Sequence, residues 1–162
     1  MTKLKMVCFD MDGTIANLYG VHNWLEHLRN ENEMPYQKAC PMWDMDRLTE
    51  ALVWLREYGV EIRIITWLAK DATADYKHRT RTAKLEWLER MGFPFDNFHG
   101  IQYGATKADC VQKYLADDET AILIDDNDKV RNGWHLGETI NPTEGNLIEK
   151  LYAILEQIIE GV

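Results

Sequence analysis

The sequence has few cysteines and no long apolar run. Its 162 residues include three cysteines, an odd number without the paired spacing of a zinc site or a redox motif. No apolar stretch reaches the roughly 18 residues needed to cross a bilayer, and the N-terminal residues lack the apolar core and cleavage site of a secretory signal. We therefore expect a cytoplasmic protein that does not associate with membranes, with reduced thiols at Cys8, Cys40 and Cys110.

Positive charge is also scarce. Lysine and arginine number 18 against 27 aspartates and glutamates, which gives a net charge of -9. A field of that sign repels phosphate polymers and anionic membranes. Any contact with nucleic acid must therefore be local.

The rest of the composition is that of an ordinary folded protein. Hydrophobic residues make up 46% of the chain and charged residues 28%, and no segment is of low complexity. A chain of this length has room for one domain with a substantial core. We expect a single domain over residues 1–162, with a small insert at about 14–44.

Short apolar runs rich in β-branched residues alternate with segments of helical periodicity. This alternation predicts an α/β fold with a mainly parallel sheet flanked by helices. The expected strands are Leu4–Phe9, Val60–Thr66, Phe98–Tyr103, Thr120–Ile124 and a weaker one at His135–Ile140. The expected helices are Asp46–Tyr58, Tyr76–Met91, Lys107–Leu115 and Gly145–Ile159. Glu61 and Arg63 do not fit a strand buried on both faces, so we expect them near its solvent end.

The insert stands outside this strand and helix rhythm. It is expected to form a small helical flap over the top of the sheet, too small to be a large lid. Its aromatic residues could stack on a substrate, but packing the flap onto the body is the commoner role. No role is assigned to them; they are Tyr19, Trp24, Tyr36 and Trp43.

Polar residues follow the predicted strands at the points where they end. The carboxyl ends of parallel strands form one edge, where ligands of open α/β sheets bind. Several carboxylates at one edge repel each other unless a cation lies between them, and all-oxygen ligands favour Mg²⁺. The sequence therefore predicts a magnesium site. The residues at this edge are Asp10, Asp12, Thr66, Lys107, Asp125 and Asp126.

The order of these elements, "DMDGT", a strand-ending threonine, a lysine and "DD" after an apolar run, resembles the haloacid dehalogenase (HAD) superfamily from Met6 to Asp128. The resemblance implies a three-layer, Rossmann-like fold and a magnesium-dependent phosphomonoester hydrolase. Asp10 would be the nucleophile that forms an aspartyl-phosphate, and Asp12 the acid and base. The dehalogenase branch lacks the second aspartate of the first motif, so Asp12 indicates phosphate esters.

The resemblance also assigns the remaining site residues. Mg²⁺ would be held by the Asp10 side chain, the Asp12 carbonyl and the pair Asp125 and Asp126. The phosphate-binding residues would be Thr66, Trp67 and Lys107. Removing Lys107 should reduce activity more than removing Thr66.

Other polar residues have simpler explanations. Asp128 is expected to cap a turn, with Arg131 as its partner. The five histidines share no spacing that indicates catalysis, and only His22 and His27, in the flap, warrant testing. The basic run at residues 77–84, "KHRTRTAK", is interpreted as a solvated helix face.

The substrate is less clearly indicated. "AKLEWLERMGFPF" and "AILIDDNDKVRNG" resemble the 5′(3′)-deoxyribonucleotidase family, although Trp67 replaces a smaller residue and the flap is shorter. We therefore expect small nucleotide-like monophosphates, with Trp67 or Trp24 as a stacking surface. The alternatives are a phosphatase acting on nucleic-acid ends, through the run at 77–84, and a non-catalytic phosphate-binding or regulatory module. The sequence leaves the natural substrate and the oligomeric state open.

Overall fold

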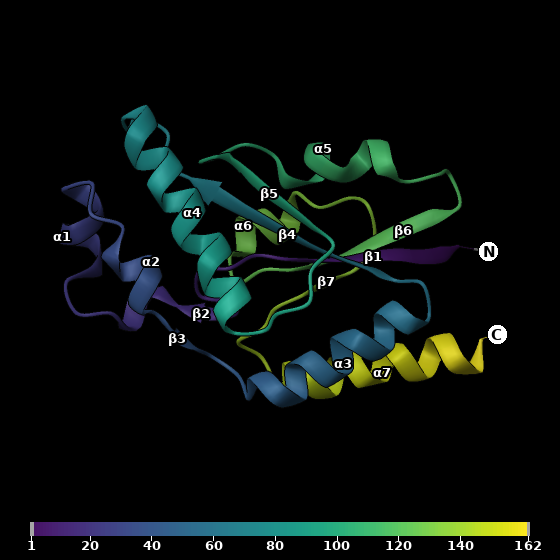
Figure 1. Ribbon diagram of the computed structural model, residues 1–162. Helices are drawn as coiled ribbons and strands as arrows, with labels where there is room; N and C mark the ends of the chain where they lie inside the picture. Colours follow the sequence, from purple (N-terminus) through teal and green to yellow (C-terminus); the bar gives the residue numbers. More distant parts are fainter. Residues whose placement is uncertain (1, 162) are drawn as a thin grey trace.

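A computed structural model describes residues 2–161, and its centre is a five-stranded parallel sheet (Figure 1). The strand order is β5-β4-β1-β6-β7. The strands are β1 (Lys3–Phe9), β4 (Glu61–Leu68), β5 (Asn97–Gln102), β6 (Glu119–Ile124) and β7 (Thr139–Ile140). All four pairings between neighbouring strands are parallel, which confirms the predicted α/β class.

Helices cover both faces of the sheet, so the protein has three layers (Figure 1). One face packs against α3 (Met45–Glu57), α4 (Ala74–Arg90) and α7 (Leu147–Glu160). The other packs against α5 (Lys107–Val111) and α6 (Asp128–Asn132), with the 3₁₀ turn η2 (Gln112–Tyr114) after α5. Among residues 2–161, no helix combines the length and apolar character needed to cross a membrane.

The central strand β1 is buried on both faces. Val7 and Phe9 belong to one hydrophobic cluster, and Met6 and Cys8 belong to the other. All four are fully buried, because alternate side chains of a strand point to opposite faces. This packing fixes the carboxyl end of β1 in the middle of the sheet edge.

The segment between β1 and α3 contains the expected small flap. It holds two short helices, α1 (Trp24–Arg29) and α2 (Met34–Lys38), and the 3₁₀ turn η1 (Leu18–Gly20). It also contains a short antiparallel ribbon that the sequence did not predict, formed by β2 (Ala16–Asn17) and β3 (Cys40–Pro41). Two-residue strands are too short for an alternating pattern to reveal.

Arg63 corrects one expectation. It does not lie at the solvent end of its strand but is 5% exposed. Its guanidinium lies 3.1 Å from Glu61 Oε2 and 4.3 Å from the centroid of the Tyr114 ring. The carboxylate and the aromatic ring replace water around the charge, which makes the buried position tolerable.

Candidate active site

Three neighbouring strands, β4, β1 and β6, end at one edge of the sheet and supply the site. Asp10 directly follows β1, Thr66 lies near the end of β4, and Asp125 directly follows β6. The backbone N–H of Asp10 donates to Ile124 O at 3.0 Å, which extends the sheet pairing to the start of the site. The strand order therefore brings together residues that are more than 100 positions apart.

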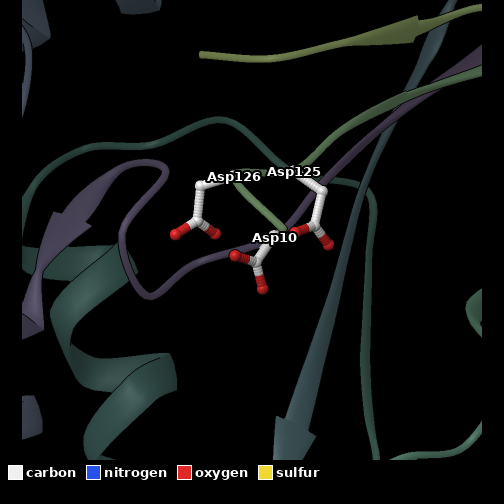
Figure 2. A group of neighbouring side chains, drawn as sticks. All are labelled: Asp10, Asp125 and Asp126. Carbon is white, nitrogen blue, oxygen red and sulfur yellow. The ribbon is translucent and has the colours of Figure 1, made fainter. Parts of the chain in front are cut away.

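The carboxylates of Asp10, Asp125 and Asp126 point toward one another (Figure 2). One oxygen from each lies within 4.8 Å of the others. Burial and the charge of Asp10 raise the pKa of Asp125, and the same causes raise the pKa of Asp126 to about 7. A cation among them would remove this penalty, and three carboxylate oxygens suit a hard divalent ion. The cluster could therefore hold a metal ion.

Lys107 lies against the same cluster. Its Nζ atom is 2.9 Å from Asp10 Oδ1 and 2.8 Å from Asp125 Oδ2. Burial opposes its charge, but the two carboxylates outweigh burial and raise the pKa of Lys107. The lysine is the first residue of α5, where the helix dipole disfavours a cation. The two carboxylates provide the compensating charge that its position requires.

Thr14 and Gly13 fix the arrangement of the carboxylates. The Thr14 hydroxyl lies 3.1 Å from Asp10 Oδ2 and 3.5 Å from Asp126 Oδ1. Gly13 has a φ of +81°, and a Cβ atom there would lie 2.4 Å from Asp126 Oδ2. Thr14 was not among the site residues expected from the sequence, although it stands inside the "DMDGT" motif.

Asp12 lies outside the carboxylate cluster. Its Oδ2 accepts a hydrogen bond from Lys84 Nζ at 3.0 Å. Burial raises the pKa of Asp12, and the charge of Lys84 opposes that rise. The two aspartates of the motif thus occupy different electrostatic environments.

Lys84 corrects the interpretation of residues 77–84 as a solvated helix face. Its side chain is fully buried, because α4 turns this residue toward the sheet with its buried neighbours Trp87 and Leu88. Lys84 Nζ also donates to Thr66 Oγ1 at 2.7 Å and to Trp67 O at 3.0 Å. The signal in the sequence was the position of Lys84, which precedes the apolar Trp87 and Leu88 by three and four residues and therefore lies on the same face of the helix.

A cavity of about 400 Å³ lies over these groups. Asp10, Asp12 and Lys107 line it together with the aspartate pair after β6. Its aromatic lining residues are Tyr19, Trp24, Tyr36, Trp67, Tyr76 and Tyr103. The volume is that of a site for a small organic ligand.

The aromatic walls come from both the flap and the body. Tyr19 and Trp24 of the flap contact each other with ring centroids 4.9 Å apart, and Trp67 and Tyr103 of the body are 4.8 Å apart. The Trp67 indole N–H donates to Ala105 O at 3.0 Å, which fixes its ring. Trp43 instead packs the flap onto the body, with its indole N–H donating to Thr14 O.

The flap is fastened to the start of α4 by Glu31. Its carboxylate accepts from the backbone N–H of Thr73 at 3.0 Å and from the Thr73 hydroxyl at 2.9 Å. Arg79 of α4 donates to Glu31 O and pairs with Glu33. The flap is thereby held over the cavity.

Asp128 and Arg131, which the sequence did not assign to catalysis, lie beside the aspartates that follow β6. Asn127, rather than Asp128, caps α6, since its side chain accepts from two backbone N–H groups of that helix. Arg131 pairs with Asp128, as expected, and donates to Asp125 O at 2.8 Å. Within residues 2–161, no histidine lines the cavity.

Comparison with solved structures identifies the fold. A candidate HAD-like phosphatase from Mesorhizobium loti matches with a TM-score of 0.59 and 10% identity, over 98% of this chain and 88% of that chain. The D,D-heptose 1,7-bisphosphate phosphatase of Burkholderia thailandensis gives a TM-score of 0.49 and 13% identity, over 93% of this chain and 98% of that chain. No family model and no curated protein matches the sequence. The first similarity shows that this chain has the fold of a HAD-like phosphatase structure.

Proposed function

We propose that this protein is a magnesium-dependent phosphomonoester hydrolase of the HAD type that acts on nucleotide-like monophosphates in the cytoplasm. One observation carries the proposal. Asp10 lies in a cluster that could hold a metal ion, Asp12 is held outside it by Lys84, and both line one cavity. A nucleophile and a separate acid and base are what hydrolysis through an aspartyl-phosphate requires.

In the first step, a carboxylate oxygen of Asp10 attacks phosphorus and the bond to the leaving oxygen breaks. Lys107, bound to Asp10 at 2.9 Å, offsets negative charge on the transferring group. Mg²⁺ bound by Asp10, the Asp12 carbonyl, Asp125 and Asp126 would reduce the repulsion between the carboxylates and the phosphate. This set of oxygen ligands matches the preference of that ion.

Asp12 acts as the acid in the first step and as the base in the second. Burial raises its pKa, so its carboxyl group retains a proton more readily than an exposed aspartate. It donates that proton to the leaving oxygen and later takes one from the water that hydrolyses the aspartyl-phosphate.

Thr66, Trp67 and Lys107 bind the phosphate in this proposal. Thr66 is fully buried and does not line the cavity. Its Oγ1 accepts a hydrogen bond from Lys84, and its own proton would be donated to a phosphate oxygen. Trp67 is the adjacent residue, and its ring lines the cavity.

The cavity walls support the choice of substrate. Lys107 is the one lysine or arginine among the residues of the described chain that line the cavity, whereas six of the lining residues are aromatic. One cation suits one phosphate group, and flat aromatic side chains suit a flat, weakly charged ring. A nucleoside monophosphate combines these two features.

Nucleic-acid ends are less well supported. Of the four cationic side chains in residues 77–84, Lys84 binds Asp12 and Arg79 binds the flap, so neither is available to a nucleic-acid backbone. A non-catalytic module is also disfavoured, since the predicted nucleophile, acid and lysine all line the same cavity.

The test is a phosphate-release assay with Mg²⁺. The substrates are 5′- and 3′-mononucleotides, sugar phosphates and end-phosphorylated oligonucleotides, and Asp10→Asn is the control. We expect mononucleotides to be hydrolysed well above sugar phosphates and Asp10→Asn to be inactive. Equal rates on all substrates would contradict the substrate class, and activity in Asp10→Asn would contradict the nucleophile.

A further inference from the structure

Lys84 carries a positive charge into the interior beside the site. Its side chain is fully buried, and a buried cation is costly unless it is paired and hydrogen-bonded. Its ammonium has three acceptors, namely Asp12 Oδ2 at 3.0 Å, Thr66 Oγ1 at 2.7 Å and Trp67 O at 3.0 Å. The buried charge is therefore both paired and hydrogen-bonded.

These three bonds account for every proton on the ammonium group, because a lysine has three donors and no acceptor. None is left for a phosphate oxygen. Lys107 differs, since two of its donors bind Asp10 and Asp125 and a third remains for the substrate. The two lysines at the site therefore serve different purposes.

The flap covers Lys84 from the other side. The Tyr36 ring, on α2, has its centroid 4.8 Å from Lys84 Nζ. Tyr36 itself lines the cavity. The ammonium is thus enclosed between the sheet and the flap, which limits its movement and that of its partners.

We propose that Lys84 is a positioning residue that orients the Asp12 carboxyl group for proton transfer. This inference rests on the proposed function. In the first step, Asp10 forms a bond to phosphorus, the bond to the leaving oxygen breaks, and Asp12 gives its proton to that oxygen. Lys84 touches neither the phosphate nor the leaving group; it fixes the group that does.

Dependence on the leaving group separates this role from a purely structural one. A nucleoside alkoxide is a poor leaving group and needs the proton from Asp12, whereas 2,4-dinitrophenolate leaves without one. A misplaced Asp12 should therefore slow formation of the aspartyl-phosphate from a mononucleotide and spare the nitrophenyl ester. Loss of folded protein reduces both rates equally.

The experiment compares kcat/KM for a nucleoside 5′-monophosphate and for 2,4-dinitrophenyl phosphate, because kcat/KM reports the steps up to aspartyl-phosphate formation. The variants are Lys84→Met and Lys84→Gln, with Lys77→Met as the control that removes the same charge from the same helix two turns away. The ratio of the two kcat/KM values is independent of the active fraction of each sample. A partly unfolded variant therefore still gives an answer.

We expect the mononucleotide to nitrophenyl ratio to fall by about 100-fold in Lys84→Met, less in Lys84→Gln, and not at all in Lys77→Met. The double variant Lys84→Met/Asp12→Asn should be no worse than Asp12→Asn alone, because both changes act on one proton transfer. An unchanged ratio with both values reduced equally would overturn the inference and leave the proposed function standing. A wild-type protein inactive on both esters would contradict the proposed function, and this role with it.

Discussion

Asp10 and Asp12 are separated by one residue, yet their carboxylates bind different lysines. Asp10 Oδ1 lies 2.9 Å from Lys107 Nζ, and Asp12 Oδ2 lies 3.0 Å from Lys84 Nζ. Two similar groups at one strand end are thereby given different chemical environments, which allows them different roles.

Replacing Lys107 should reduce activity strongly. Lys107→Met removes the cation that binds Asp10 and Asp125, and we expect kcat to fall by about 100-fold or more. Thr66→Val should cost less, since it removes one neutral donor. Steady-state assays with saturating Mg²⁺ measure both, and Lys113→Met, at an exposed position in η2 just after α5, is the control. A larger loss in Thr66→Val would show the order to be wrong.

Without metal, the protein should lose stability as the pH rises. The pKa of Asp126 is raised from 3.8 to about 7 in the folded protein, so between these values the folded state holds more protons than the unfolded state. The free energy of unfolding therefore falls as the pH rises through this interval. Mg²⁺ should counter the loss near neutral pH and have little effect near pH 4, where protons occupy the carboxylates.

Thermal unfolding with EDTA or with Mg²⁺ at several pH values checks this. Asp126→Asn should flatten the pH dependence and weaken the effect of Mg²⁺. Equal stabilisation by Mg²⁺ at both ends of the pH range would refute the linkage.

Gly13 should be required for metal binding as well as for backbone conformation. Gly13→Ala places a methyl group 2.4 Å from Asp126 Oδ2 and should displace that carboxylate. Gly59→Ala is a matched control, since Gly59 has a similar φ of +85° with nothing within 4 Å of its Cβ position. Both should lose roughly 1 kcal/mol of stability from the positive φ. Calorimetric titration should show weaker Mg²⁺ binding in Gly13→Ala only.

Trp67 should contribute to binding of the base. Loss of one stacking surface costs about 1–3 kcal/mol, so Trp67→Ala should raise KM for a mononucleotide by about 5- to 150-fold and leave glycerol phosphate nearly unaffected. Trp67→Phe keeps an aromatic ring but loses the hydrogen bond to Ala105. Its KM for the mononucleotide should lie between those of the wild type and Trp67→Ala. A similar change for both substrates would leave Trp67 with its proposed contact to the phosphate and contradict its contact with the base.

Removing the hydrogen bonds between Glu31 and Thr73 should loosen the flap. Glu31→Ala removes both bonds to Thr73, each worth about 1 kcal/mol, and should raise KM with a smaller effect on kcat. Limited proteolysis should cut residues 19–42 faster than in the wild type. Glu26→Ala, at an exposed position on the same flap, should resemble the wild type. If Glu31→Ala were cut no faster than the wild type, the bonds between Glu31 and Thr73 would not hold the flap.

The sheet and its polar edge could be predicted because both depend on local patterns. β1 and β6 are apolar runs that end in aspartates, and parallel strands place those ends at one edge. The structure gathers Asp10, Asp125 and Asp126 as this argument expects. The bounds of β7 were harder to predict, because this edge strand consists only of Thr139–Ile140.

Lys84 and Glu31 could not be predicted in the same way. Lys84 stands in a strongly charged segment, so composition favoured exposure, although its spacing to Trp87 and Leu88 placed it on the buried face of α4. Glu31 and Thr73 are 42 residues apart, and no periodic pattern links a loop of the flap to the start of a helix. Tertiary contacts decide both cases.

Apart from Trp67 on β4, the residues proposed for substrate choice lie on a different part of the chain from those proposed for phosphoryl transfer. Asp10, Thr66 and Asp125 belong to the ends of three adjoining strands, whereas Tyr19, Trp24 and Tyr36 belong to the flap. Mutations on the flap away from Tyr36, which lies against Lys84, can therefore accumulate without disturbing the reactive carboxylates. Such a division lets evolution alter which ester is accepted while the chemistry at phosphorus is inherited unchanged.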